Sequence, residues 1–302
     1  MKNKPIYVEI PIEAEIDKLW NASQTPDQHE QWDLRFSSIT YLPKEENQPQ
    51  KFTYKTKIGF GLAVEGWGKS VGSFHAKDGS RTSSLHFGTD QSFSIIREGR
   101  GYWKYIPEAD SSITFLTQYD YKTNFGRVGK LFDCLIFRPM MGWATALSFD
   151  VLKRWLENGD TPSSQYMKFF CNWVIAFLFS FIWVYHGLVP KLIAMHQVEL
   201  SMMQNVIPIS TNLAASLTAV IGVIEVVFGL VWLVYSNKRK LFGLQLFVFP
   251  FLGIGAIISD PAFLFHPFNP LTYNMVLFVL SILGFMISKD VPTAKSCKRK
   301  RD

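Results

Sequence analysis

Apolar and polar residues alternate along much of the first half of the chain. Between residues 51 and 58, aromatic and aliphatic side chains alternate with lysines, and the same two-residue period returns between residues 113 and 121. This period is typical of antiparallel strands that bury one face. Residues 6–10 predict a further short strand. The first half of the chain therefore predicts a sheet of several antiparallel strands.

Helical patterns lie on both sides of this predicted sheet. Apolar side chains recur at intervals of three and four between residues 12 and 20, and Pro26 is typical of the first position of a second helix. Residues 126–159 return to a mainly helical pattern that ends at Gly159, a common stop. The predicted order is strand, two short helices, several antiparallel strands and one long helix.

Long apolar runs dominate the second half of the chain. Each run approaches or reaches the roughly 20 residues that a helix needs to cross a bilayer. A connection rich in turn residues, 159–164, precedes them, and Glu225 interrupts the second run. The pattern predicts an all-α bundle of four transmembrane helices, at residues 169–190, 213–235, 241–258 and 271–288.

The formal charge of +6 lies in this second half. Residues 1–165 hold 20 basic and 20 acidic side chains, whereas residues 166–302 hold 11 basic and 5 acidic ones. The surplus forms two clusters beside apolar runs, 238–240 and 298–301, which indicates membrane orientation and argues against a nucleic-acid partner. The beginning of the chain also lacks the apolar stretch of a secretory signal. We expect a multi-pass protein of a bacterial-type cell membrane, with both termini in the cytoplasm.

Two short motif matches are rejected on their context. Residues 63–70 fit a relaxed phosphate-loop pattern and residues 68–72 fit a nucleophile-elbow pattern, but both motifs need a helix directly after them. Residues 71–80 are instead typical of a strand and a turn. We therefore expect a bent, glycine-rich strand.

Other polar residues of the first half form no recognisable constellation. Five are candidates for polar groups of a cavity, yet no spacing unites them: Glu65, His75, His86, Arg97 and Arg100. The three cysteines are widely separated and indicate neither a disulfide framework nor a zinc site. No metal site is predicted, the cofactor is unknown, and the absence of a complete catalytic constellation leaves open whether the protein is an enzyme.

Two stretches of the chain resemble known families. WDLRFSSITYL (32–42), GSRTSSL (79–85) and the block 132–159 resemble the SRPBCC or START-like superfamily. This resemblance implies a helix-grip fold around an apolar cavity, binding of hydrophobic ligands and, in some members, cyclase or hydrolase chemistry. WVYHGLVPKL (183–192), MHQVELSMM (195–203) and Glu225 resemble the DoxX-like membrane family, whose DoxX members are linked to quinone-dependent sulfur oxidation.

The predicted fold class is therefore an α+β helix-grip (START-like) N-terminal domain followed by an all-α four-helix transmembrane bundle. The expected domains are a cytoplasmic ligand-binding domain at 1–162, a DoxX-like membrane domain at 163–290 and a basic cytoplasmic tail at 291–302, which we expect to contact anionic headgroups.

A polar cluster inside the bundle is the candidate site. Rise per residue places four polar residues, His186, Glu225, Tyr273 and Asn274, about 20 to 27 Å above the lysines that mark the inner surface. Glycines flank Glu225 on its helix face, so we expect a close neighbouring span and a pairing with His186. The alternative is a neutral Glu225 that serves packing alone. The candidate residues are His186, Glu225, Tyr273, Asn274, Lys191 and Glu199.

The leading hypothesis is a membrane-tethered protein that binds or transfers a hydrophobic small molecule, a lipid or a quinone, at the inner membrane surface. The expected partners are membrane lipids and that ligand, and a membrane protein partner is compatible with the pattern. Two alternatives stay open: a subunit of a quinone-linked membrane oxidoreductase, and a membrane sensor that responds to a ligand.

Overall fold

The chain folds into two compact units. A computed structural model describes residues 4–301 except 45, 47 and 60. The first unit comprises Met1–Tyr166 together with Pro292–Asp302, and the second comprises Met167–Val291. The boundary falls four residues beyond the predicted one. The sequence suggested a separate tail at 291–302, but residues 292–302 belong to the first unit.

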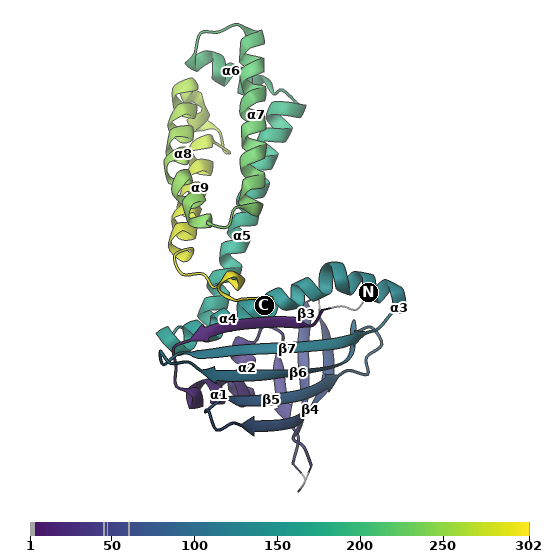
Figure 1. The fold of residues 1–302 in the computed structure, drawn as a ribbon. Helices are drawn as coiled ribbons and strands as arrows, with labels where there is room; N and C mark the ends of the chain where they lie inside the picture. Colours follow the sequence, from purple (N-terminus) through teal and green to yellow (C-terminus); the bar gives the residue numbers. More distant parts are fainter. Residues whose placement is uncertain (1–3, 45, 47, 60, 302) are drawn as a thin grey trace. The chain divides into compact units, whose positions relative to one another are not determined.

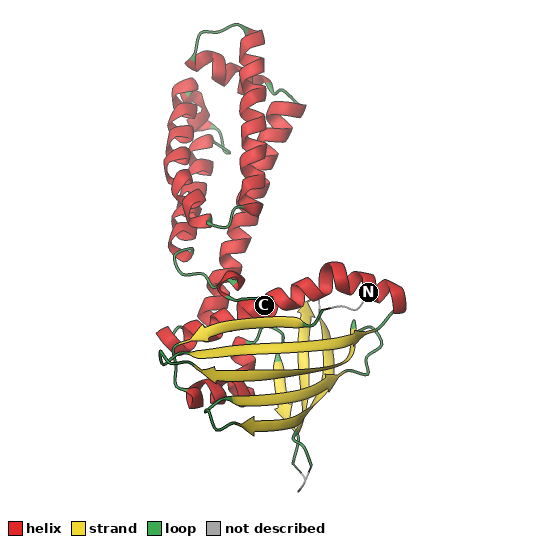
Figure 2. Cartoon of the chain, in the orientation of Figure 1, coloured by secondary structure: helices red, strands yellow, loops and turns green. Residues whose placement is uncertain are grey.

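The first unit contains a curved sheet, drawn in yellow in Figure 2. Its described residues form seven strands in the order β1-β7-β6-β5-β4-β3-β2. All neighbouring strands are antiparallel. β1 therefore pairs with the last strand along the chain and forms one edge of the sheet. The strands are β1 (Ile6–Ile12), β2 (Ser38–Tyr41), β3 (Lys51–Gly59), β4 (Leu62–His75), β5 (Arg81–Gly88), β6 (Ile96–Pro107) and β7 (Ile113–Thr123).

The helices of the first unit occur in the predicted order. α1 (Ile16–Gln24) and α2 (Pro26–Trp32) connect β1 to β2. After β7 come α3 (Gly126–Phe132), a π-helical turn η1 (Asp133–Phe137) and α4 (Arg138–Asn158), one directly after the other (Figure 1). Gly159 ends α4 with a φ of 79°.

α4 packs on the sheet through buried aromatic and aliphatic side chains. The ring of Phe149 stacks on that of Phe115 in β7 with 4.5 Å between centroids, and both side chains are fully buried. Val8, Ile10 and Ile12 of β1 contribute to the same core. A curved antiparallel sheet that packs around one long C-terminal helix is the helix-grip fold, so the predicted fold class of this part is confirmed.

The glycine-rich stretch that matched two motifs is part of β4. Gly66 and Gly68 lie opposite Tyr54 and Phe52 of β3. A Cβ atom on either glycine would overlap the ring of its cross-strand partner. The glycines therefore make room for two aromatic rings, and the expectation of a bent strand is confirmed by the irregular pairing between Ser70 and Gly72.

The last residues of the chain cover the edge strand β1. Glu9 and Lys298 exchange two backbone hydrogen bonds of 2.9 Å. The amide of Thr293 donates to Oδ2 of Asp150 at 2.9 Å, and Cys297 donates to the carbonyl of Ala146 at 3.2 Å. The tail thus satisfies part of an open sheet edge, a role that its basic composition did not predict.

The second unit is all-helical, as predicted, apart from its connections. Among the described residues, four helical segments are long and apolar enough to cross a membrane, and the first of them begins within the first unit: Pro162–Ile193, Thr211–Val234, Lys238–Ser259 and Pro270–Ile287. Phe179, Trp232, Phe242 and Phe249 form its buried aromatic core. The elements are α5 (Pro162–His186), η2 (Gly187–Ile193), α6 (Gln197–Val206), α7 (Thr211–Val234), α8 (Lys238–Ser259), η3 (Pro261–Phe265) and α9 (Pro270–Ile287).

Lys238, which the charge pattern assigned to an inner loop, begins α8. Its side chain is buried, with Nζ 4.9 Å from the centroid of the Trp173 ring and in contact with the carbonyl oxygen of Trp232. Arg239 lies 3.9 Å from the ring centroid of Phe285 and donates to the Phe285 carbonyl at 3.1 Å. Two members of this basic cluster therefore also hold helices of the second unit together.

Candidate functional site

The candidate site forms where α5 and η2 pack closely on α7. A Cβ atom on Gly222 of α7 would lie 2.8 Å from the carbonyl oxygen of Gly187 and 3.0 Å from Cβ of Lys191. A Cβ atom on Gly229 would lie 2.9 Å from the carbonyl oxygen of Ser180. Only glycine permits such close backbone contact. The glycines that flank Glu225 thus have the close neighbour that their spacing predicted.

Lys191 lies between two carboxylates from different helices. Its Nζ is 3.0 Å from Oε2 of Glu225 in α7 and 3.5 Å from Oε1 of Glu199 in α6. The side chains of Lys191 and Glu225 are only 11% and 12% exposed, and that of Glu199 is 26% exposed. A charge in an apolar bundle needs a partner of opposite sign. With all three groups ionised, the cluster has two negative charges and one positive charge.

A π-helical segment positions Lys191. η2 contains Pro190, which has no N–H to donate and therefore interrupts the regular hydrogen-bond ladder. The chain continues through wider hydrogen bonds, from Ala194 to Val189 at 2.9 Å and from His196 to Pro190 at 2.8 Å. π-helical turns are frequent at functional sites. Here the turn joins His186 at the end of α5 to the lysine of the ion-paired cluster.

His186 forms a second pair with Tyr273. Its Nε2 lies 3.2 Å from the Tyr273 hydroxyl of α9, and their ring centroids are 5.5 Å apart. Asn274 instead donates to the carbonyl of Pro270 in its own helix at 2.8 Å. The six predicted residues therefore divide into the trio Lys191, Glu199 and Glu225, the pair His186 and Tyr273, and Asn274 alone. The hydrogen-bond partner of His186 is therefore Tyr273, whereas the sequence predicted a pairing with Glu225.

A second polar cluster lies inside the START-like domain. The carboxylate of Asp33 is buried and accepts hydrogen bonds from Arg35, at 2.9 Å from Nε and 2.6 Å from Nη2. Nε2 of His29 lies 3.1 Å from the same carboxylate. Burial by itself would raise the pKa of Asp33, but the charge and hydrogen bonds of Arg35, with those of His29, hold this pKa well below its usual range.

Aromatic rings lie beside this charge pair, and the ring centroid of Phe36 is 5.5 Å from Cζ of Arg35. The ring of His29 lies 5.2 Å from that of Phe36 and 4.8 Å from that of Trp103, and Phe36 lies 5.5 Å from Tyr54. Burial raises the pKa of Tyr54 to about 12. Three of these rings, those of His29, Phe36 and Tyr54, are only partly buried. We call His29, Phe36, Tyr54 and Trp103 the aromatic cluster.

Sequence reasoning missed this second cluster and considered other polar residues instead. Glu65, His75, Arg97 and Arg100 are exposed side chains of β4 and β6. His86 lies 3.6 Å from Glu98 across the sheet. The available signal was Asp33 and Arg35, two opposite charges inside the otherwise apolar stretch WDLRF.

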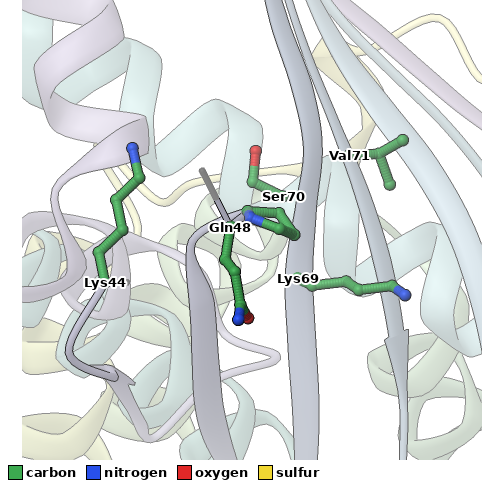
Figure 3. Close-up of a pocket in the computed structure, with 6 residues that line it drawn as sticks. Lys44, Gln48, Lys69, Ser70 and Val71 are labelled. Atoms are coloured by element: carbon green, nitrogen blue, oxygen red, sulfur yellow. The ribbon is translucent and has the colours of Figure 1, made fainter. Parts of the chain in front are cut away.

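Two surface hollows of the first unit lie outside both clusters. One, of about 640 Å³, is lined by Lys44, Gln48, Lys69 and their neighbours (Figure 3). The other, of about 330 Å³, is lined by polar residues around Trp67. Among the described residues, no three His, Cys, Asp or Glu side chains come together in a way that could hold a metal ion.

Comparison with known proteins agrees with this architecture. The DoxX-like family model matches residues 180–282, which include all six candidate residues of the membrane domain. Fold and sequence thus define a membrane protein that joins a START-like domain to a DoxX-like helical domain. YndG, an uncharacterized membrane protein of Bacillus subtilis (strain 168), is 37% identical over 303 residues, which cover 100% of this chain and 99% of YndG. The chain belongs to the same family as YndG.

Solved structures resemble the first half only distantly. The hypothetical protein jhp0584 of Helicobacter pylori is 15% identical over 50% of this chain and 86% of that chain, with a TM-score of 0.39. A START superfamily protein of Mycobacterium smegmatis is 10% identical over 46% and 91%, with a TM-score of 0.34. The Zhui aromatase/cyclase of a Streptomyces species is 8% identical over 52% and 98%, with a TM-score of 0.39. The helix-grip assignment rests on the strand order and on α4.

Proposed function

We propose that this membrane protein binds a hydrophobic small molecule, a lipid or a quinone, in its START-like domain and exchanges it with the bilayer. The observation that carries the proposal is the aromatic cluster, whose partly buried rings lie beside the buried Asp33–Arg35 pair. Apolar ligand sites typically combine such rings with a few fixed polar groups. The rings would contact the apolar body of the ligand, and a polar end would lie toward the charge pair.

The membrane domain gives this proposal a physical advantage. An insoluble ligand is concentrated in the bilayer, and a binding domain attached to four spans meets it at a high effective concentration. The trio Lys191, Glu199 and Glu225 offers a cation and two carboxylates to the polar head of a ligand inside the bundle.

We place the START-like domain on the cytoplasmic side, at the inner membrane surface. An even number of spans returns the chain to the side on which it began. The tail after the last span belongs to the same unit as the START-like domain and pairs with β1, which supports this arrangement. The basic clusters beside the apolar runs favour the cytoplasm.

A quinone site within the membrane domain is the second candidate function. The pair His186 and Tyr273, 3.2 Å apart, favours it, because imidazole and phenol groups donate hydrogen bonds that quinone carbonyl oxygens accept. Such a site would make the protein part of a quinone-linked oxidoreductase.

The test is to purify the full chain in mild detergent and to identify retained small molecules by mass spectrometry. We expect a lipid or quinone that is enriched over the bulk membrane extract. Phe36→Ala should lower its retention because it removes one ring of the aromatic cluster. Phe93→Ala, at an exposed aromatic side chain outside the cluster, is the matched control and should change little.

A second variant distinguishes between the two candidate sites. Glu225→Gln keeps the size of the side chain and removes its charge opposite Lys191. If Glu225→Gln loses the small molecule and Phe36→Ala retains it, the binding site lies in the membrane domain and not in the START-like domain. A wild-type protein that retains no enriched molecule, and binds none from lipid and quinone panels, would contradict the proposal.

A further inference from the structure

The helical segment before α4 presents large apolar side chains to the surroundings. Between Phe125 and Trp143, most apolar residues of α3, η1 and the first turns of α4 are exposed. We call this surface the α3–η1 ridge. Its central residues are 40% to 75% exposed: Val128, Leu131, Phe132, Leu135, Ile136 and Met140. So many neighbouring exposed apolar side chains mark an interaction surface.

The polar side of the same segment is the one that faces the protein. Asp133 is fully buried, accepts a hydrogen bond from the Tyr121 hydroxyl at 2.7 Å, and pairs with Nε of Arg138 at 2.9 Å. A helix on a soluble domain normally buries its apolar face and exposes its charges. The α3–η1 segment has the reverse arrangement, so its outer face suits apolar surroundings.

The exposed charges of the ridge are positive. Arg127 and Lys130 are exposed beside its apolar residues. From Asn124 to Phe149 the one acidic residue is Asp133, whose side chain is buried. Apolar side chains with flanking cations are typical of a segment that lies in the boundary between headgroups and acyl chains of an anionic bilayer.

The ridge also continues onto the face of α4 to which the chain returns from its last span. Trp143 and Asp150 are seven residues apart and so share one face of α4. The amide of Thr293 is bound to Asp150. Only residues 288–292 connect this anchor to the end of α9 at Ile287. The end of the ridge and the anchor of the tail therefore share one face of α4.

We propose that the α3–η1 ridge docks the START-like domain onto the surface of the bilayer that holds the spans, through its apolar side chains and through Arg127 and Lys130 to anionic lipid. The inference depends on the membrane domain and on the exposure of the ridge. It does not depend on which ligand the START-like domain binds.

The native Cys134 in η1 provides the test. It is exposed on the ridge, whereas Cys297 is partly covered and burial raises its pKa to about 12. The full chain with Cys171→Ser and Cys297→Ser is labelled at Cys134 with an environment-sensitive fluorophore. It is then reconstituted into vesicles of phosphatidylcholine and phosphatidylglycerol. We expect blue-shifted emission that loses most of its intensity when nitroxide-labelled lipids are added, and weaker quenching in phosphatidylcholine alone.

Matched variants make the result specific. Leu131 and Leu62 are 62% and 61% exposed, but only Leu131 lies on the ridge. Leu131→Glu should reduce the quenching, whereas Leu62→Glu should not, and both should keep the wild-type unfolding temperature. The same fluorophore at Phe74→Cys, in a chain that also carries Cys134→Ser, should show water-like emission. Water-like emission at Cys134 would overturn the proposal. Blue-shifted emission that labelled lipids do not quench would overturn it too, in favour of a protein partner.

Discussion

Two ion pairs with little exposure to solvent differ in how well the sequence predicts them. Asp33 and Arg35 are two residues apart, so their pairing needs no knowledge of the fold. Lys191 and Glu225 are on different helices and meet only because η2 packs on α7. The level of the polar residues in the bundle was predictable from helical rise, but the choice of partner was not, because it depends on rotation of each helix.

The Asp33–Arg35 pair predicts a pH-dependent stability. Asp33→Asn should lower the free energy of unfolding at neutral pH by roughly 3 kcal/mol, because it leaves the guanidinium of Arg35 buried without its counter-ion. The pKa of Asp33 is lower in the folded state than in the unfolded chain. Its stabilising effect is therefore fully present above the unfolded pKa of about 4 and is lost as the pH falls below that value.

Denaturant unfolding of the full chain in detergent, followed by tryptophan fluorescence, measures this effect. The difference between wild type and Asp33→Asn should shrink from neutral pH to about pH 3. Asp27→Asn, at an exposed position of α2, is the control and should behave as wild type at every pH. A difference that is independent of pH would show that the carboxylate charge of Asp33 is not what stabilises the fold.

Whole elements were predicted well where one local signal defines them. The two-residue period defined the strands, and Gly159 marked the end of α4. The start of α5 at Pro162 was missed because residues 162–168 are polar enough to hide a helix from a search for apolar runs. The π-helical turns η1 and η2 were also missed. The first depends on a tertiary contact of Asp133 with Tyr121, and the second follows from Pro190, which indicates a break in the ladder of hydrogen bonds but not its form.

The contact between η2 and α7 predicts a strong response to a small substitution. Gly222→Ala would place a Cβ atom 2.8 Å from the Gly187 carbonyl oxygen, a backbone atom that cannot move independently of its helix. The two helices must separate, which also parts Lys191 from Glu225. We expect a clearly lower unfolding temperature in detergent, measured by circular dichroism.

The matched control for this substitution is another helical glycine. A Cβ atom on Gly255 of α8 would meet no atom within 4 Å. Gly255→Ala should be neutral or slightly stabilising, because alanine favours a helix by about 1 kcal/mol over glycine. Equal unfolding temperatures for the two variants would contradict the close packing of η2 and α7.

At the scale of the whole molecule, the sequence revealed two different halves but not the partner of its last residues. The division between an alternating, charge-balanced half and an apolar half was visible in composition. The pairing of Lys298 with Glu9 was not, because it joins residues 289 positions apart and uses only backbone atoms. This pairing has a consequence for topology, since it holds both ends of the chain in one unit.

The final prediction concerns this topology. In a chain without its three native cysteines, single cysteines replace exposed residues in four regions. Lys77 lies after β4, Lys300 in the tail, Asn205 at the end of α6 and Phe268 before α9. Intact bacterial cells are treated with a membrane-impermeant thiol reagent. Asn205→Cys and Phe268→Cys should react, because the connections between the first and second and between the third and fourth spans carry few basic residues and should face outward.

Lys77→Cys and Lys300→Cys should react only after the cells are lysed, which also serves as the control for their accessibility. Reaction of both in intact cells would reverse the proposed orientation but preserve the number of spans. Reaction of only one of them would be more serious, because an even number of spans and the pairing of the tail with β1 both require the START-like domain and the tail to share one side. The labelling pattern thus tests the orientation and the pairing separately.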